Sequence, residues 1–148
     1  MPLAATTLHR ELVRMGEFVT GAEAAIGWAD AYATYASAAT QMAAAPHVAG
    51  TVATSTITPE LAFVATDFYG ALEDALVAFW PVALPLGFPG SKLIIAPSGL
   101  ARALVGPSAA ALAAPTDTAA LLPIAEAIHA WTLTVSGQTA GDTPFTVT

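Results

Sequence analysis

Charged residues are scarce in this sequence. Its 148 residues include four basic and eleven acidic side chains, for a net charge of −7. Charged residues make up 10% of the chain, whereas an ordinary soluble domain carries about 25%. Because 55% of the residues are hydrophobic, a single folded copy would expose Ala, Thr and Leu over much of its surface. Contiguous apolar patches usually mark contact sites, so the composition predicts a chain that associates with copies of itself.

Cysteine is absent from the chain. Its absence excludes disulfide bonds, thiol catalysis and cysteine-ligated metal sites, and it leaves the redox compartment open. A chain of this length is expected to form one domain, with a hydrophobic core that needs no covalent cross-links. The N-terminus lacks a basic region followed by an apolar core, and His9, Arg10 and Glu11 arrive early. We therefore expect no signal peptide.

Two uncharged stretches, residues 31–59 and 75–91, raise the question of membrane insertion. A spanning helix needs about 20 consecutive, mostly apolar residues. The first stretch is interrupted by Pro46 and Gly50, and the second contains three prolines between residues 81 and 89. Proline removes a backbone donor and breaks a helix interior, so we expect no membrane-spanning segment.

The charge balance also argues against nucleic-acid binding. A net negative charge repels phosphate, and four scattered cations do not make the basic patch from which such affinity derives. We expect no direct sequence-specific binding to nucleic acid. An acidic wall past which DNA slides is compatible with the same charge.

Apolar residues in the first third of the chain recur at alternating steps of four and three, which indicates one face of a helix. They are Leu8, Leu12, Met15, Val19, Ala22, Ile26, Ala29 and Ala33. The pattern fits one long helix over residues 7–45 or two helices that break at Thr20-Gly21. We favour the break, because Thr20 and Glu23 form a capping-box pattern and the glycines of this region disfavour a helix interior.

The next segments are divided by prolines. Pro46 is expected to end the helix, and residues 47–58 lack helical period, which predicts a loop or a weak edge strand. Thr58-Pro59 is a favourable helix start, and Trp80-Pro81 is a stop. The buried stripe of this helix is predicted to comprise Leu61, Ala65, Phe68, Leu72, Ala75 and Phe79.

The second half begins with an apolar connector over residues 81–97, which contains a short predicted strand at 92–96. Helical turns follow from Ser98, as the cap, to about 105 and again up to Pro115. The last helix is predicted over 117–132 with Thr116 as its cap, and Pro123 either kinks it or marks its first turn. Residues 133–148 alternate apolar and polar side chains around a turn-rich segment, which predicts a hairpin or a pair of extended arms. Because an isolated hairpin is marginal in water, it should pair with the chain's own sheet or with a neighbour.

The predicted fold class is mainly α, an irregular helical bundle of four or five helices with a small C-terminal β hairpin or extended arm. The predicted organisation is a helical domain over residues 1–132, with the internal apolar connector 81–97, and a C-terminal β arm over 133–148.

The candidate catalytic motifs in the sequence lack the spacing or the partner residues that catalysis requires. Glu126 and His129 form a Glu-x-x-His pair on one helical face, but a di-iron bundle needs two such pairs and two further glutamates, so a symmetric dimer would be required. Ser98 lacks the Gly-x-Ser-x-Gly context of a nucleophile, and residues 87–92 lack Walker spacing. We assign no catalytic, cofactor-binding or metal-binding residue and expect a non-enzymatic protein without a cofactor.

Neither the isolated histidines nor the grouped acids indicate a metal-binding or catalytic site. His9 and His47 lie in no metal-ligand spacing, and we expect them at the surface. Asp67, Glu73 and Asp74 could form a carboxylate pair for acid-base work, but helical geometry favours a solvated acidic face.

The segment from Trp28 to Ala36, the later Phe79-Trp80-Pro81, and the helix from Ile124 to Trp131 with its threonine-rich tail carry a resemblance. In style and order of elements, over most of the chain, they resemble small alanine-rich virion proteins of tailed bacteriophages. The resemblance implies a structural subunit that self-associates and docks to other virion proteins. It is compatible with a capsid cement, neck or tail component, located in the virion and assembled in the host cytoplasm.

Aromatic residues are the predicted subunit contacts. The candidates are Trp28, Tyr32, Tyr35, Phe79, Trp80, Phe88, Trp131 and Phe145. One alternative function is a secreted, alanine-rich helical partner-binding protein of the mycobacterial Pro-Glu type, although Pro59-Glu60 lies mid-chain instead of at the N-terminus. Another is a small dimeric carboxylate-metal enzyme that uses Glu126 and His129 with iron or manganese.

Overall fold

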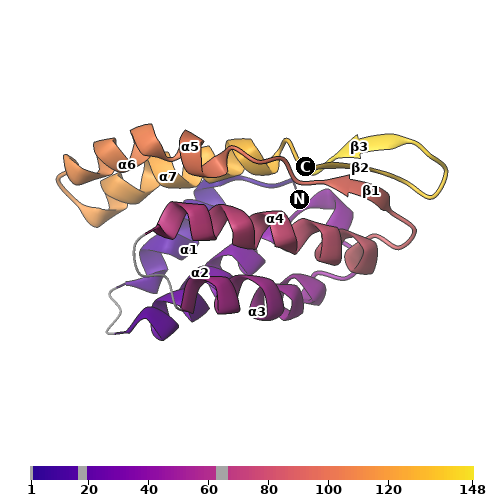
Figure 1. The fold of residues 1–148 in the computed structure, drawn as a ribbon, viewed down its shortest axis with the longest axis horizontal. Helices are drawn as coiled ribbons and strands as arrows, with labels where there is room; N and C mark the ends of the chain where they lie inside the picture. The colour runs from indigo at the N-terminus through magenta and orange to yellow at the C-terminus, as the bar shows by residue number, and fades with distance from the viewer. Residues whose placement is uncertain (1, 17–19, 63–66) are drawn as a thin grey trace.

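The computed structural model describes residues 2–16, 20–62 and 67–148 (Figure 1). The helices in these ranges are α1 (Ala5–Met15), α2 (Gly21–Ala36), the 3-10 helix η1 (Thr40–Met42), α3 (His47–Ala62), α4 (Phe68–Gly87), α5 (Leu100–Ala103), α6 (Val105–Leu112) and α7 (Asp117–Thr132). The strands are β1 (Lys92–Ile95), β2 (Ser136–Gln138) and β3 (Pro144–Thr146).

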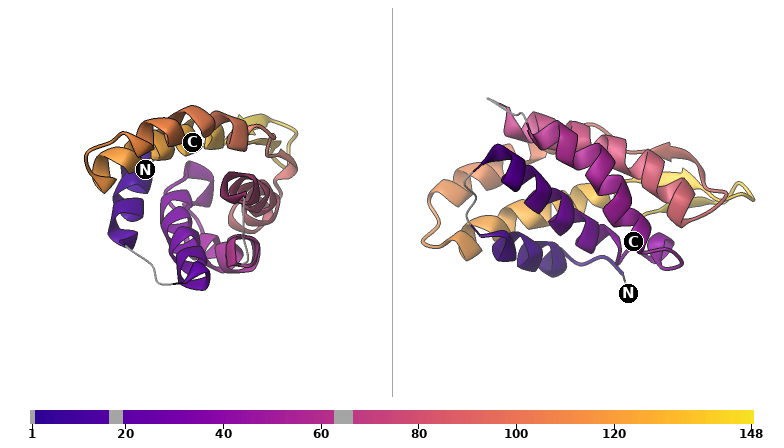
Figure 2. Two further views of the ribbon diagram at one scale, coloured as in Figure 1. Left: turned by 60° about the vertical axis from the view of Figure 1, so that its left-hand side comes forward. Right: turned by 90° about the horizontal axis from the view of Figure 1, so that it is seen from below.

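The elements form two layers. Helix α2 packs against α3, α3 packs against α4, and α1 contacts both α2 and α7. Helices α5, α6 and α7 and the small sheet lie together above the α1–α4 bundle (Figures 1 and 2). Within the upper layer, α6 lies at one end of the long axis and the sheet lies at the other (Figure 1). The fold class is confirmed as mainly α with a small C-terminal β element.

The predicted break between the first two helices is confirmed. Thr20 precedes α2 and accepts a hydrogen bond from the Glu23 amide at 3.1 Å, while the Thr20 amide donates to the Glu23 carboxylate at 3.3 Å. This capping box satisfies two amides that have no partner within the helix. Helix α2 ends at Ala36, well before residue 45. The predicted stripe positions Val19 and Ala65 lie outside the described residues.

Residues 47–58 were predicted as a loop or strand, and this prediction is wrong, because they belong to α3. Ala49, Ala53, Ile57 and Leu61 recur every four residues and are buried, so one apolar face supplies the packing energy. The Thr and Ser hydroxyls on the other faces bond to carbonyls of the preceding turn, for example Thr54 to Gly50 at 3.0 Å. The tertiary contacts with α2 and α4 outweigh the weak helix propensity of this segment.

Prolines do not end the helices where the sequence predicted. Pro59 lies inside α3, and Pro81 and Pro85 lie inside α4. All three are exposed, so the carbonyls that lose a partner face water, while the apolar side of each helix stays packed. The helix predicted to start at Thr58 and stop at Trp80 is therefore corrected: α4 starts after Asp67 and continues to Gly87 through part of the predicted connector.

Helix α4 is the central helix of the core. Its buried residues are Leu72, Ala75, Leu76, Phe79, Trp80, Ala83, Leu84 and Gly87. Among the described residues it is the one helix long and apolar enough to cross a membrane by length and composition. In this fold its apolar side chains pack against α3, α5 and the sheet.

The segment after the sheet strand forms two short helices. Ser98 was predicted to cap the first one, but the Glu73 carboxylate does so instead, by accepting the amides of Gly99 at 2.9 Å and Ala101 at 2.6 Å. Thr116 caps α7 as predicted, because its hydroxyl accepts the Ala119 amide at 3.1 Å. Pro123 lies within α7. The described part of the chain forms seven α-helices, more than the four or five expected.

The C-terminal hairpin pairs with the chain's own strand β1. The antiparallel order is β1-β2-β3, with Gly137 opposite Phe145. The chain end is fixed on the far side of β3, where the Gln41 side-chain amide donates to the Thr146 carbonyl at 2.9 Å and accepts the Thr148 amide at 3.1 Å. One face of the sheet packs on the helices through Ile94 and Phe145, and the other face is open.

A matched pair of glycine substitutions tests this packing. A Cβ at Gly137 would lie 2.6 Å from Ile94 Cδ1 and 2.9 Å from Phe145 Cζ, whereas a Cβ at Gly50 in α3 meets nothing within 4 Å. We expect Gly137→Ala to lower the free energy of unfolding by about 1–3 kcal/mol. Gly50→Ala should raise it by about 1 kcal/mol. Urea denaturation measures both, and equal effects of the two substitutions would contradict the sheet geometry.

Candidate functional site

Five of the eight aromatic residues predicted as subunit contacts lie inside the folded chain. Tyr35, Phe79 and Trp80 have no exposed surface, and Tyr32 and Trp131 are 2% and 7% exposed. The five rings are therefore not available to a partner, and their assignment as contacts is corrected. Aromatic side chains of this size supply the burial that an alanine-rich chain needs for a core. Trp28, Phe88 and Phe145 are half-buried and remain candidates.

The buried rings surround a chain of hydrogen bonds that joins three helices. The Trp80 indole N–H donates to the Tyr32 hydroxyl at 2.9 Å. The Thr132 hydroxyl donates to the Ile128 carbonyl at 2.9 Å, which leaves its oxygen to accept the Tyr32 O–H at 2.9 Å. Burial raises the pKa of Tyr32 far above its ordinary value, so the phenol stays neutral. The arrangement is complete and uncharged, and it contains no strong base.

The Glu126–His129 pair is turned toward different surroundings. His129 Nδ1 lies 2.7 Å from the Tyr35 hydroxyl, while Glu126 is exposed. A neutral imidazole with its proton on Nε2 accepts the Tyr35 O–H at Nδ1. Residues 2–16, 20–62 and 67–148 contain no group of three His, Asp or Glu side chains that could hold a metal. This geometry lends no support to the carboxylate-metal alternative.

Of the three acids Asp67, Glu73 and Asp74, the first two cap helices. The Asp67 carboxylate accepts the Gly70 amide at 2.9 Å at the start of α4, and Glu73 caps α5 as described above. Asp74 is exposed. The interpretation as a solvated acidic face is correct for Asp67 and Asp74, which are exposed, whereas Glu73 is half-buried against α5. Asp67 and Glu73 also lie at positive helix ends. His47 is exposed, and the His9 ring bonds the Thr118 carbonyl at 2.7 Å.

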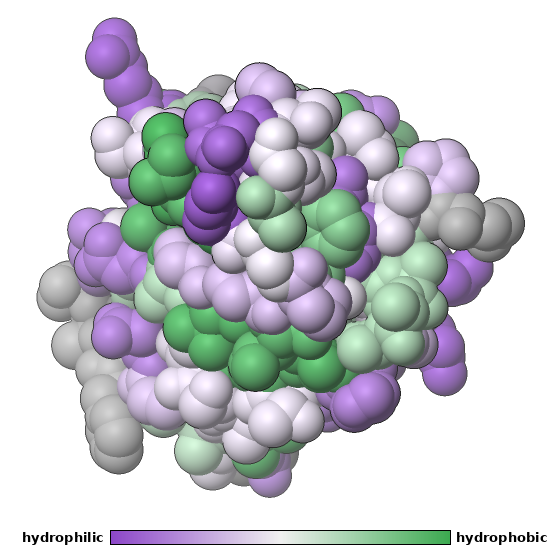
Figure 3. Space-filling model, turned by 90° about the vertical axis from the view of Figure 1, so that its right-hand side faces the viewer, coloured by the Kyte–Doolittle hydropathy of each residue, from purple (hydrophilic) through white to green (hydrophobic). Residues whose placement is uncertain are grey.

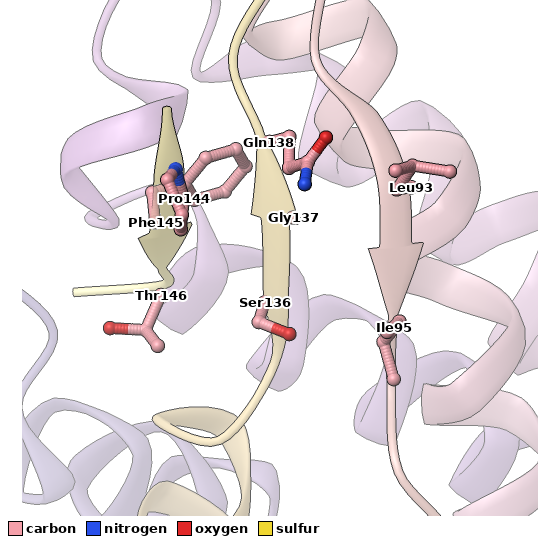
Figure 4. A pocket seen from close by; sticks show the side chains of 8 residues that line it. All are labelled: Leu93, Ile95, Ser136, Gly137, Gln138, Pro144, Phe145 and Thr146. Atoms are coloured by element: carbon pink, nitrogen blue, oxygen red, sulfur yellow. The ribbon is translucent and has the colours of Figure 1, made fainter. Parts of the chain in front are cut away.

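The open face of the sheet forms a shallow apolar groove of about 510 Å³. Strand β1 presents Leu93 and Ile95, which are 66% and 60% exposed, and β3 presents Pro144 on the far side. Between them, β2 carries Ser136, Gly137 and Gln138. The middle of the sheet lies low at the small residues Ser136 and Gly137, and the Gln138 side chain lies between Pro144 and Leu93 (Figure 4). None of the described residues that line the groove is charged.

Leu93 adopts an unusual backbone conformation. The register of β1 against β2 shifts between Lys92 and Ile95, and Leu93 within this bulge has φ of 52°. The left-handed region costs an L-residue other than glycine about 1–2 kcal/mol. Such conformations cluster at functional positions, and here the bulge directs a leucine side chain into solvent.

Helix α6 carries a second exposed apolar surface. None of its residues within 105–112 is buried. Val105, Ala109 and Leu112 follow the i, i+4, i+7 spacing of one helical face, and Val105 and Leu112 are 66% and 92% exposed. An apolar stripe in this spacing is what a helix presents to a groove. We call these three residues the α6 stripe.

The contact residues named from the sequence were all aromatic, so the aliphatic residues of both surfaces were not among them. The available signal was the absence of charge between residues 103 and 116 together with consecutive aliphatic residues at 93–95. Comparison of the chain with protein-family models, with curated proteins and with solved structures found no match. The function is therefore inferred from these surfaces and from the buried hydrogen bonds.

A double-mutant cycle tests the buried chain of hydrogen bonds. Tyr32→Phe leaves the Trp80 indole N–H without a hydrogen-bond acceptor. Thr132→Val leaves the Tyr32 O–H without a hydrogen-bond acceptor. Each should lower the free energy of unfolding by about 1–3 kcal/mol. The loss of unfolding free energy in the double variant should be about 1 kcal/mol smaller than the sum of the losses in the two single variants, because both partners of the Tyr32–Thr132 bond are then absent. Strict additivity in urea denaturation would show that the two hydroxyls do not interact.

The His129 environment predicts a pH dependence of stability. Burial lowers the pKa of this imidazole from its ordinary 6.5, so the unfolded chain binds a proton at a higher pH than the folded chain does. The contribution of His129 to the free energy of unfolding should therefore be complete above about pH 6.5. It should decrease as the pH drops from there through the folded pKa. In urea titrations, His129→Asn should flatten this part of the profile. An unaltered slope in His129→Asn contradicts the assignment.

Proposed function

We propose that this protein is a non-enzymatic structural subunit that acts by self-association within a larger assembly. The observation that carries the proposal is the pair of exposed apolar surfaces, the sheet groove and the α6 stripe, in a chain with only four basic residues. Large contiguous apolar patches are rare on proteins that remain single and usually mark contact sites. The interior suits a structural role, because the Trp80 indole, the Tyr32 phenol and the Thr132 hydroxyl pair with one another between three helices.

The assembly that the resemblance favours is the virion of a tailed phage, built in the host cytoplasm, in which the chain would also dock to other virion proteins. The extended α/β upper layer offers two separate surfaces, as a subunit with two neighbours requires. Gene position tests this part alone: a portal or capsid gene beside this one is expected, and a place among genes of metabolism would contradict the virion assignment.

Sedimentation velocity tests self-association directly. At micromolar concentration we expect species heavier than the 14.9 kDa chain, and their share should grow with concentration because association follows mass action. The control is circular dichroism at the same concentrations, which should report unchanged helix content. A folded 14.9 kDa species alone across the micromolar range would refute the proposed function.

A further inference from the structure

Acidic residues are absent from two long segments of a chain that is otherwise acidic, residues 31–59 and 75–116. No Asp or Glu occurs between residues 75 and 116, while two of the four basic residues, Lys92 and Arg102, lie there. This segment contains β1, α5 and α6. Two copies that each carry a charge of −7 repel one another at long range. They approach with least repulsion through surfaces that carry no acid. Of the two acid-free segments, 31–59 and 75–116, the second contains exposed large hydrophobic side chains, among them Leu93, Ile95, Val105 and Leu112.

Charge on the sheet is also cancelled locally. The Lys92 ammonium lies 2.6 Å from the Asp142 carboxylate of the hairpin loop, so the charge at the rim of the groove is balanced. At the sheet end of the molecule, hydrophobic side chains reach the surface among polar ones (Figure 3). The groove therefore accepts an uncharged apolar partner without leaving an unpaired charge buried.

The same chain presents such a partner at its other end. The α6 stripe is apolar, uncharged and almost fully exposed at Leu112. Because α6 and the sheet lie at opposite ends of the upper layer (Figure 1), α6 does not reach the groove of its own chain. A contact between the two surfaces joins two copies.

We propose that the α6 stripe of one copy docks in the sheet groove of a second copy, with Leu112 seated against Leu93 and Ile95 of β1. The inference rests on the proposed function and assigns its interface. The contact accounts for the exposed Leu93, whose left-handed backbone is unfavourable in the isolated chain. The contact joins two different surfaces. Two copies that make it in both directions form a closed dimer, whereas copies that make it in one direction only form a ring or an open chain.

Disulfide trapping tests this contact, because the chain has no cysteine of its own. The double variant Ile95→Cys with Leu112→Cys should form cross-linked multimers under mild oxidation, since a disulfide needs Cα atoms within about 7 Å. Each single variant should stay uncross-linked, because like surfaces do not meet. The matched control pairs Leu112→Cys with Ile26→Cys, whose side chain is 52% exposed on α2, and should give no multimers.

A second variant measures the same contact without cross-linking. Leu93→Gly removes an exposed side chain and suits the positive φ, so the unfolding midpoint should hold or rise. Self-association should weaken about tenfold or more, as expected from the loss of one buried leucine. Ile26→Asp is the surface control and should leave self-association unchanged.

The outcomes separate the inference from the proposed function. A wild-type chain that sediments as a monomer overturns both. An oligomeric wild type whose 95/112 double variant fails to cross-link, or whose single variants cross-link alone, overturns the docking mode and leaves self-association standing. An oligomeric wild type with cross-links in the 95/112 variant only, and with weaker association in Leu93→Gly, supports the inference.

Discussion

The hydroxyl group of Tyr32 is the interaction on which the rest of the structure depends. It accepts from Trp80 of α4 and donates to Thr132 of α7, while Tyr32 itself belongs to α2. One buried oxygen therefore joins the lower bundle to the upper layer. A buried polar group is costly unless it is paired, so the helices fit together in the one arrangement that satisfies all three side chains. This specificity is needed because alanine faces alone pack in many registers.

Scarcity of charge shapes the surface as much as the core. Several of the few acids cap helices: Glu23 at α2, Asp67 at α4 and Glu73 at α5. They stabilise helix ends locally and leave little charge for the sheet and α6. The apolar surfaces at the two ends of the upper layer follow from this distribution, and so does the proposal that copies meet there.

Local signals in the sequence predicted much of the fold. The caps at Thr20 and Thr116 and the strand and hairpin around residues 92 and 137 were predicted correctly, because each depends on neighbours in the chain. The prolines at 59, 81 and 85 misled, because whether a proline marks a helix boundary depends on which face it occupies, and that face is set by tertiary packing. The same reason explains α3, whose Thr-rich sequence is helical only against α2 and α4.

The candidate site was less predictable than the fold. Aromatic size indicates burial but does not distinguish a core from an interface. Tyr35 and Trp80 were therefore predicted as subunit contacts, although they are core residues. The groove depends on a bulge at Leu93 and on a small middle strand, which arise only when three distant segments pair.

Hydrogen exchange measured over a range of protein concentrations tests the central claim most directly, because it reports where copies meet. We expect the amides of β1 and α6 to become more protected as the concentration rises, while those of α3 keep the same exchange rates. Exchange in β1 and α6 that is independent of concentration, or new protection confined to α3, would contradict assembly through the uncharged surfaces of the upper layer.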